Sequence, residues 1–210
     1  MKWHFLIGFV LFSGSTWAQL PDDVTDTRKK NESVLKLPKG DMRSELAYFT
    51  MAGIDESMGK SPLVKVPFSD VGPDFMAFKG TNISATVTIA PFVPAKHKLD
   101  YDEKYLIKID RKPYYGGYGF IPKTVINKVT MVVNRDTISI PPVAYSDLYN
   151  LNFSYLNKGT QKSTNGIYRS SDGDRLYLYI FCKDKTGSYE VTWVFVNRRY
   201  ARRIIDYGFM

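Results

Sequence analysis

Residues 175–196 read RLYLYIFCKDKTGSYEVTWVFV, in which two runs of aromatic and aliphatic residues flank a short polar stretch. Aromatic and β-branched residues favour strands, and a loop of about four residues is a common connection between antiparallel strands. The two runs therefore predict a β-hairpin around DKTG at 184–187. This loop length places Leu178 opposite Trp193 in the neighbouring strand.

Turn signals on both sides extend the hairpin into a larger sheet. Asp172-Gly173 precedes the first strand, and Asn197-Arg198 follows the second. Asp-Gly is a strong hairpin signal because glycine adopts the positive φ of a tight turn at little cost. Residues 166–207 are therefore predicted to form a four-stranded antiparallel meander.

Both faces of this meander carry large apolar side chains. One face is expected to be core, with Cys182 as a small buried hydrophobe and not a nucleophile. Its other members are Leu176, Leu178, Ile180, Val191, Trp193 and Phe195. The opposite face carries Tyr168, Tyr177, Tyr179, Phe181, Thr192 and Val194. A solvated sheet face is normally polar, so either another part of the chain covers these aromatics or they form an exposed platform for a sugar ring, a peptide or a partner protein.

The remainder of the chain also favours strands. Short runs of strand-forming residues recur about every ten positions between turn signals, and no window of about a dozen residues keeps helical spacing. The expected strands span 45–52, 62–67, 75–79, 83–90, 104–110, 124–133 and 137–140. The sequence therefore predicts an all-β fold, an antiparallel β-sandwich or partly open barrel of about ten strands that ends in the C-terminal four-stranded meander.

The first residues have the layout of a secretory signal peptide. Lys2 precedes an apolar run at 5–12, and the small residues Thr16 and Ala18 precede a cleavage position. We therefore expect residues 1–18 to be a signal peptide and the protein to be exported, to a periplasm or outside the cell. A membrane span needs about 20 apolar residues, so no transmembrane segment is expected in the mature chain.

The mature chain is expected to have two parts. Residues 19–40 are polar without apolar periodicity and are predicted to be a flexible leader. Residues 41–210 are predicted to be a single β-rich domain, with the polar stretch 157–166 as a candidate subdivision.

The residue inventory argues against several classes of site. Cys182 is the only cysteine, and His97 is the only histidine after the predicted signal peptide. Neither a disulfide nor a usual zinc site can be assembled from them, and no metal or other cofactor is expected. The formal net charge of +8 indicates an anionic partner or only good solubility. Nucleic acid is disfavoured because no binding motif is present.

Carboxylates are the remaining catalytic candidates. Asp100, Asp102 and Glu103 cluster in LDYDEK. Two carboxylates about 5 to 9 Å apart could serve a secreted hydrolase of the glycosidase type. The alternative is a solvated turn between strands.

The stretch KPYYGGYGFIPK at 112–123 is a second concentration of aromatic residues. Proline ends strand pairing and glycine permits sharp reversals, so this stretch is predicted to be a loop between strands. Its tyrosines, Tyr114, Tyr115 and Tyr118, either fold back to plug the end of the sandwich or line a binding site.

A dense basic run, NRRYARRIID, spans 197–206. Strand alternation puts Arg202 and Arg203 on opposite faces, and stacking would follow if Arg202 lies beside Trp193 or Arg203 beside Tyr179. The charges could contact acidic glycans or lipid head groups, or protect an edge strand from pairing with other chains.

These features favour an exported, non-catalytic binding or adaptor protein that engages a glycan, a peptide or a cell-envelope protein. The predicted ligand-binding residues are Tyr114, Tyr115, Tyr118, Tyr177, Tyr179, Arg202 and Arg203. A carboxylate-based hydrolase and a structural subunit of an envelope assembly are the alternatives, the latter with the aromatic face as a permanent interface.

Overall fold

The computed structural model describes residues 24–27, 40–46, 63–183 and 187–209. Within these ranges the predicted all-β fold is confirmed, since antiparallel strands in several sheets dominate and helix is scarce. The sheets do not close into a barrel. None of the helices among the described residues has the length and hydropathy needed to span a bilayer.

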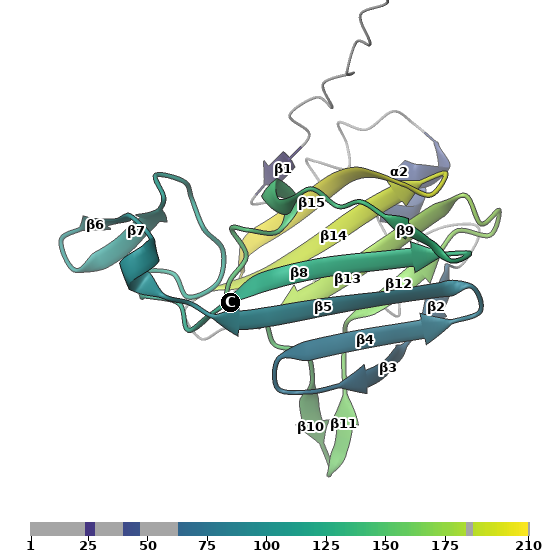
Figure 1. The fold of residues 1–210 in the computed structure, drawn as a ribbon, viewed down its shortest axis with the longest axis horizontal. Helices are drawn as coiled ribbons and strands as arrows, with labels where there is room; N and C mark the ends of the chain where they lie inside the picture. Colours follow the sequence, from purple (N-terminus) through teal and green to yellow (C-terminus); the bar gives the residue numbers. More distant parts are fainter. Residues whose placement is uncertain (1–23, 28–39, 47–62, 184–186, 210) are drawn as a thin grey trace, which may run out of the picture.

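The C-terminal meander is the larger sheet (Figure 1). It contains β12 (Gly166–Arg169), β13 (Arg175–Cys182), β14 (Ser188–Val196) and β15 (Arg199–Phe209), paired antiparallel in chain order. β2 (Val64–Val66) extends it beside β12, and β1 (Val24–Thr27) extends it beside β15 as a parallel strand. The expected register is confirmed, because Leu178 lies opposite Trp193.

A second sheet packs across the meander (Figure 1). Its strands are β3 (Phe68–Val71), β4 (Phe75–Gly80), β5 (Ile83–Pro91), β8 (Thr124–Val133) and β9 (Asp136–Ile138), which are hydrogen-bonded in that order. β8 has the bounds expected from the sequence. Alternate residues of β5, such as Ala85 and Val87, are buried, while Thr86 and Thr88 are partly exposed on the outer face.

Two hairpins project from the sandwich (Figure 1). β6 (Leu99–Asp102) and β7 (Tyr105–Ile109) form an arm at one end, preceded by the short 3-10 helix η1 (Pro94–Lys96). β10 (Tyr155–Asn157) and β11 (Thr160–Lys162) form the other hairpin, and every residue of these two strands is exposed. The 3-10 helix η2 (Pro142–Ala144) leads into the connection between the second sheet and the β10–β11 hairpin.

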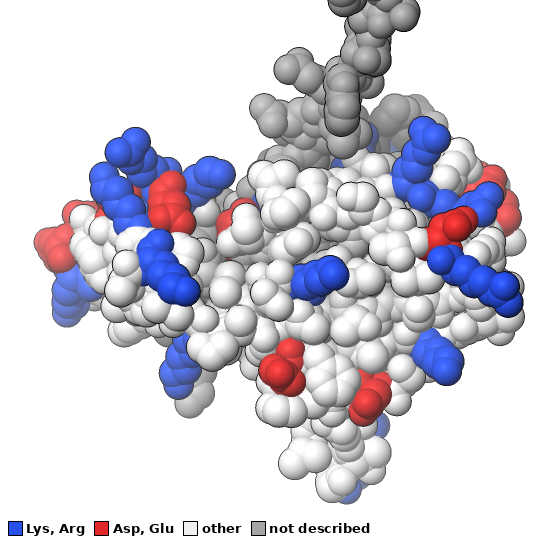
Figure 2. All heavy atoms as spheres, in the orientation of Figure 1, with Lys and Arg blue, Asp and Glu red and all other residues white. Residues whose placement is uncertain are grey.

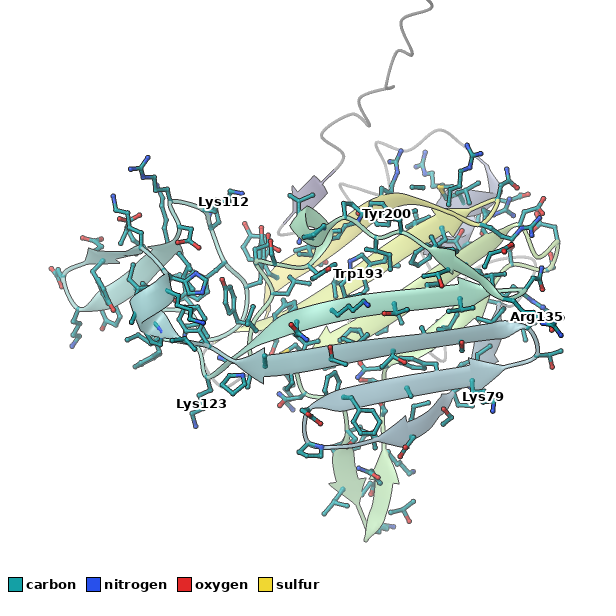
Figure 3. All side chains as sticks on the ribbon, viewed as in Figure 1. Lys79, Lys112, Lys123, Arg135, Trp193 and Tyr200 are labelled. Atoms are coloured by element: carbon teal, nitrogen blue, oxygen red, sulfur yellow. The ribbon has the colours of Figure 1, made fainter. Side chains whose placement is uncertain are left out.

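One core lies between the two sheets. Met76 and Val87 enter it from the second sheet, and Leu178, Trp193 and Ile205 enter it from the meander. In Figure 3 the Trp193 label marks this inter-sheet layer. The polar stretch 157–166, which we considered as a subdivision, contains the end of the β10–β11 hairpin and the start of β12, whose Ile167 belongs to this same core.

The N-terminal region differs from the expectations where it is described. Residues 45–52 were expected to be a strand, but Glu45 and Leu46 end the short helix α2 (Asp41–Leu46), whose sequence DMRSEL has no β-branched residue and an acidic first turn. Val24–Thr27, within the predicted leader, forms β1, which agrees with its valine and two threonines. The predicted signal peptide, residues 1–18, lies outside the described residues.

The aromatic face of the meander is covered, so the exposed platform considered for it is wrong. Tyr177 and Tyr179 are both 0% exposed and form a second core with Leu46 of α2 and with Leu63. Glu45 of α2 binds the guanidinium of Arg175 through two hydrogen bonds, of 2.8 and 3.0 Å. The hydroxyl of Tyr177 also donates to Glu45, and burial, followed by this contact, raises the pKa of Tyr177.

Candidate functional site

The aromatic loop, defined here as residues 112–123, is organised around the hydroxyl of Tyr114. This oxygen lies 3.1 to 3.3 Å from the carbonyl oxygens of Leu106, Gly117 and Phe120, and it accepts a hydrogen bond from the backbone N–H of Gly119 at 3.1 Å. Burial raises the pKa of Tyr114, so the hydroxyl stays protonated and can donate. A single phenol therefore ties the loop to itself and to β7.

Two tight reversals in this loop require glycine. Gly116 has φ +94°, and a Cβ built on it would lie 2.2 Å from the carbonyl oxygen of Tyr149. Gly119 has φ +82°, and its Cβ would lie 3.0 Å from the ring of Tyr105. Both positions combine a positive φ with close packing, which a larger residue could not satisfy.

Tyr115 plugs the end of the sandwich, as one of the two predicted alternatives requires. Its backbone pairs with the segment after η2, with hydrogen bonds to Asp147 and from Tyr149. Its buried ring meets that of Tyr207 at a centroid distance of 5.0 Å, and the guanidinium carbon of Arg203 lies 6.0 Å from the ring centroid.

The second half of the loop points outward instead. Tyr118 is 69% exposed and Phe120 is 59% exposed, beside Ile121 and beside Tyr105 of the arm. Among the described residues, seven of the eleven exposed large apolar side chains lie between residues 93 and 121. Apolar surface is therefore concentrated at this end of the molecule, as is common at binding sites.

One groove begins at this loop, and a second groove adjoins the first. The first, of about 580 Å³, runs from Phe120 and Ile121 past the ends of β5 and β8 to Asn150 and Asn152. The second, of about 480 Å³, is lined by Asn152, Phe153, Ser154, Tyr155, Thr164, Phe181 and Lys183. Both grooves include Asn152 and Lys183 in their lining. These two residues, joined by a hydrogen bond of 2.6 Å, therefore form the border that the two grooves share.

The two asparagines on the groove wall have fixed orientations. The Oδ1 of Asn150 accepts the backbone N–H of Lys123 at 2.8 Å and that of Thr124 at 3.3 Å. The Nδ2 of Asn152 donates to the carbonyl oxygen of Lys183. Because N–H groups can only donate and a carbonyl can only accept, these contacts determine which way each amide faces. Asn150 thus keeps an NH₂ group, and Asn152 a carbonyl oxygen, for other partners.

The described residues that line the grooves carry no carboxylate, histidine or cysteine; their charged side chains are Lys123 and Lys183. Likewise, no group of His, Cys, Asp and Glu residues in the described ranges could hold a metal ion. The exposed surface of this face is mostly uncharged over β5 and β8; most charges gather toward its two ends, with a basic side chain at the centre and acidic side chains below it (Figure 2). This arrangement can bind by stacking, hydrogen bonding and positive charge, and its described residues supply no acid–base pair for hydrolysis.

The predicted ligand-binding residues are thus divided. Tyr118 is exposed beside the grooves, Tyr114 and Tyr115 support the loop from within, and Tyr177 and Tyr179 lie under α2. Tyr179 donates to the buried carboxylate of Glu190 on β14.

The two arginines differ from the expected placement. A register shift between Val194 and Phe195 puts Arg203 opposite Trp193 and Arg202 opposite Val194. Arg203 is buried, binds Asp147 through both terminal nitrogens and therefore supports the fold. Arg202 is partly buried on the face that packs toward α2.

The carboxylate candidates lie on the arm. Asp100 is 3.7 Å from the ammonium of Lys98, while Asp102 and Glu103 are exposed at the turn between β6 and β7. None of the three lines either groove.

The groove residues Lys123, Asn150, Asn152, Tyr155 and Lys183 were not predicted. The segment YNLNFSY at 149–155 holds a usable signal, since its two asparagines are spaced by two and are interleaved with aromatics. No role was predicted for this segment from the sequence. Comparison with protein-family models, with curated proteins and with solved structures finds no match to this chain.

Proposed function

We propose that this protein is an exported, non-catalytic glycan-binding protein that holds a sugar chain in the two grooves beside the aromatic loop. The observation that carries the proposal is the pair of fixed amides, Asn150 and Asn152, next to the exposed ring of Phe120. Export is proposed from the signal-peptide layout of residues 1–18.

Sugar chemistry fits this lining. A sugar hydroxyl both donates and accepts hydrogen bonds, and Asn150 and Asn152 offer one donor group and one acceptor group in fixed positions. The apolar C–H face of a sugar ring can pack on aromatic rings such as Phe120 in the first groove and Tyr155 in the second. Fixed side chains also reduce the entropy cost of binding.

A peptide fits less well. Extended peptides commonly bind by adding a strand to an open sheet edge. The grooves cross the ends of β5 and β13, and each of these strands already has a neighbour on both sides. The open strand edge at the grooves is that of β10, which supplies Tyr155 but is only three residues long, so the described lining offers mainly side-chain amides and rings.

Binding to a glycan array tests the proposal. We expect purified residues 19–210 to bind at least one polysaccharide, and Phe120→Ala or Asn152→Ala to lower the affinity about tenfold or more. Tyr101→Ala is the matched control, because Tyr101 is also exposed but does not line a groove. An array without any bound glycan, or an equal loss in the control, would contradict the proposal.

A further inference from the structure

We infer that the glycan held in these grooves is acidic, with carboxylate, phosphate or sulfate groups that contact Lys123 and Lys183. This inference rests on the proposed function and concerns the same grooves. The first support is the lining itself, in which every charged side chain among the described residues is a lysine.

The two lysines are placed to act on a ligand. Lys123 precedes β8 and extends outward at the arm end of the sheet (Figure 3). Lys183 follows β13 at the border that the grooves share, where its carbonyl accepts a hydrogen bond from Asn152 and its side chain is exposed. Neither ammonium has an ion-pair partner among the described residues, in contrast to Lys98 with Asp100 on the arm.

The sequence around the grooves strengthens the charge argument. Residues 111–135 and 148–171, which supply most of the lining, contain no aspartate or glutamate. Their basic residues include Lys123, which lines the first groove, and Lys162, which pairs with the groove residue Tyr155; others, such as Arg135, lie away from the grooves (Figure 3). A cleft lined by one sign of charge raises the local concentration of ligands of the opposite sign.

The shared border of the two grooves also predicts how an acidic chain would lie. Tyr155, in the second groove, pairs across its hairpin with Lys162, so a positive charge also accompanies the ring at the far end. An extended chain that starts near Lys123 and crosses Lys183 would pass a lysine in the first groove, at the shared border and beside the second groove. It would also pass an aromatic ring in each groove. A chain with repeated acidic residues fits this alternation better than a single charged sugar.

An array of matched pairs tests the inference. Each acidic polysaccharide is printed beside its neutral form: polygalacturonate beside the same polymer after carboxyl reduction, and a sulfated galactan beside its desulfated form. We expect residues 19–210 to bind the acidic member at least about tenfold more tightly, with the preference falling as salt is raised. The two pairs distinguish carboxylate from sulfate as the preferred group.

Matched lysine variants assign the effect to the grooves. Lys123→Gln and Lys183→Gln should each reduce the acid-to-neutral preference several-fold. Lys79→Gln should leave this preference unchanged. Lys79 is exposed near the end of β4 that lies away from Lys123 (Figure 3). All three lysines are exposed, so the variants are expected to fold.

The outcomes separate the two proposals. Equal binding of both members of each pair overturns the acidic inference and leaves the glycan-binding function standing. No binding to any printed glycan overturns both. A preference that Lys79→Gln reduces as much as Lys123→Gln does also overturns the inference, because the preference is then an effect of net charge and not of the grooves.

Discussion

The meander and the aromatic loop contain the same kinds of side chain but use them in opposite ways. Tyr177 and Tyr179 in β13 are fully buried, whereas Tyr118 and Phe120 in the loop are largely exposed. The difference lies in the cover: Leu46 of α2 and Leu63 pack on β13, while the loop tip is open to solvent. Aromatic content alone therefore does not tell a core from a binding surface.

The largest expected effect comes from making the same change, tyrosine to alanine, in both regions. Tyr179→Ala should lower the free energy of unfolding by about 3 to 5 kcal/mol, because it leaves a cavity and removes a partner of buried Glu190. Tyr118→Ala should change it by less than about 0.5 kcal/mol. Urea denaturation of both variants measures the difference, and similar losses would show that the loop tip is packed in solution.

The same comparison between a buried and an exposed side chain can be made for the arginines of the basic run, beginning with Arg203. Arg203→Leu should cost about 3 kcal/mol, since it leaves Asp147 without its bidentate partner at the junction of β15 and the aromatic loop. Arg199→Leu, at an exposed position of the same strand, is the control and should stay within about 0.5 kcal/mol. If both variants unfold at the same urea concentration, Arg203 is not structural, and its predicted role in ligand binding regains support.

Much of the fold could be predicted because it depends on local patterns. The alternation in β13 and β14, together with the turn residues between strands, determined both the register and the two faces of the meander. β3 and β6 were missed, since FSDV and LDYD are short and mix charged with apolar residues. The register shift that places Arg203 opposite Trp193 has no signal in the sequence.

The candidate site could be predicted only in part. Tyr118 was found because the loop was conspicuous, but the grooves depend on contacts between distant segments. Asn150 is oriented by the backbone of Lys123, and Asn152 by the carbonyl of Lys183, 31 residues further on. Likewise, the cover over Tyr177 comes from Glu45, 132 residues before it. Pairings at such separation cannot be deduced from one sequence by periodicity.

Tyr114 connects the buried and exposed halves of the loop. Tyr114→Phe should lower the free energy of unfolding by about 1 to 2 kcal/mol, because the Gly119 N–H and the surrounding carbonyls lose their shared partner. Glycan affinity should fall as well, since Phe120 then loses its fixed position. Tyr105→Phe removes a hydroxyl from an exposed tyrosine nearby and should change neither quantity. Unfolding in urea and titration with the bound glycan measure both effects, and a stable Tyr114→Phe variant with unchanged affinity would refute the supporting role.

The smallest expected effect concerns the arm, where an exposed carboxylate links the segment before β6 to the end of β7. Asp110 accepts hydrogen bonds from His97 Nδ1 at 2.7 Å and from the backbone N–H of Lys98 at 2.9 Å. These bonds, led by that of His97, lower the pKa of Asp110 below its ordinary value of 3.8. A carboxylate with a lowered folded pKa contributes stability above the unfolded value, and that contribution is lost as the pH falls through the folded pKa.

Asp110→Asn should therefore be less stable than the parent protein at pH 6, and the gap should close as the pH falls below about 4. The gap should be small, because the carboxylate is 53% exposed and solvent screens its interactions. Urea midpoints of both proteins, measured from about pH 2.5 to about pH 6, cover the ordinary aspartate pKa of about 4 and therefore show this difference. A stability difference that stays constant over this range would mean that the charge of Asp110 does not stabilise the arm. The stability of the arm, and of the exposed end of the aromatic loop beside it, would then not depend on the charge of Asp110.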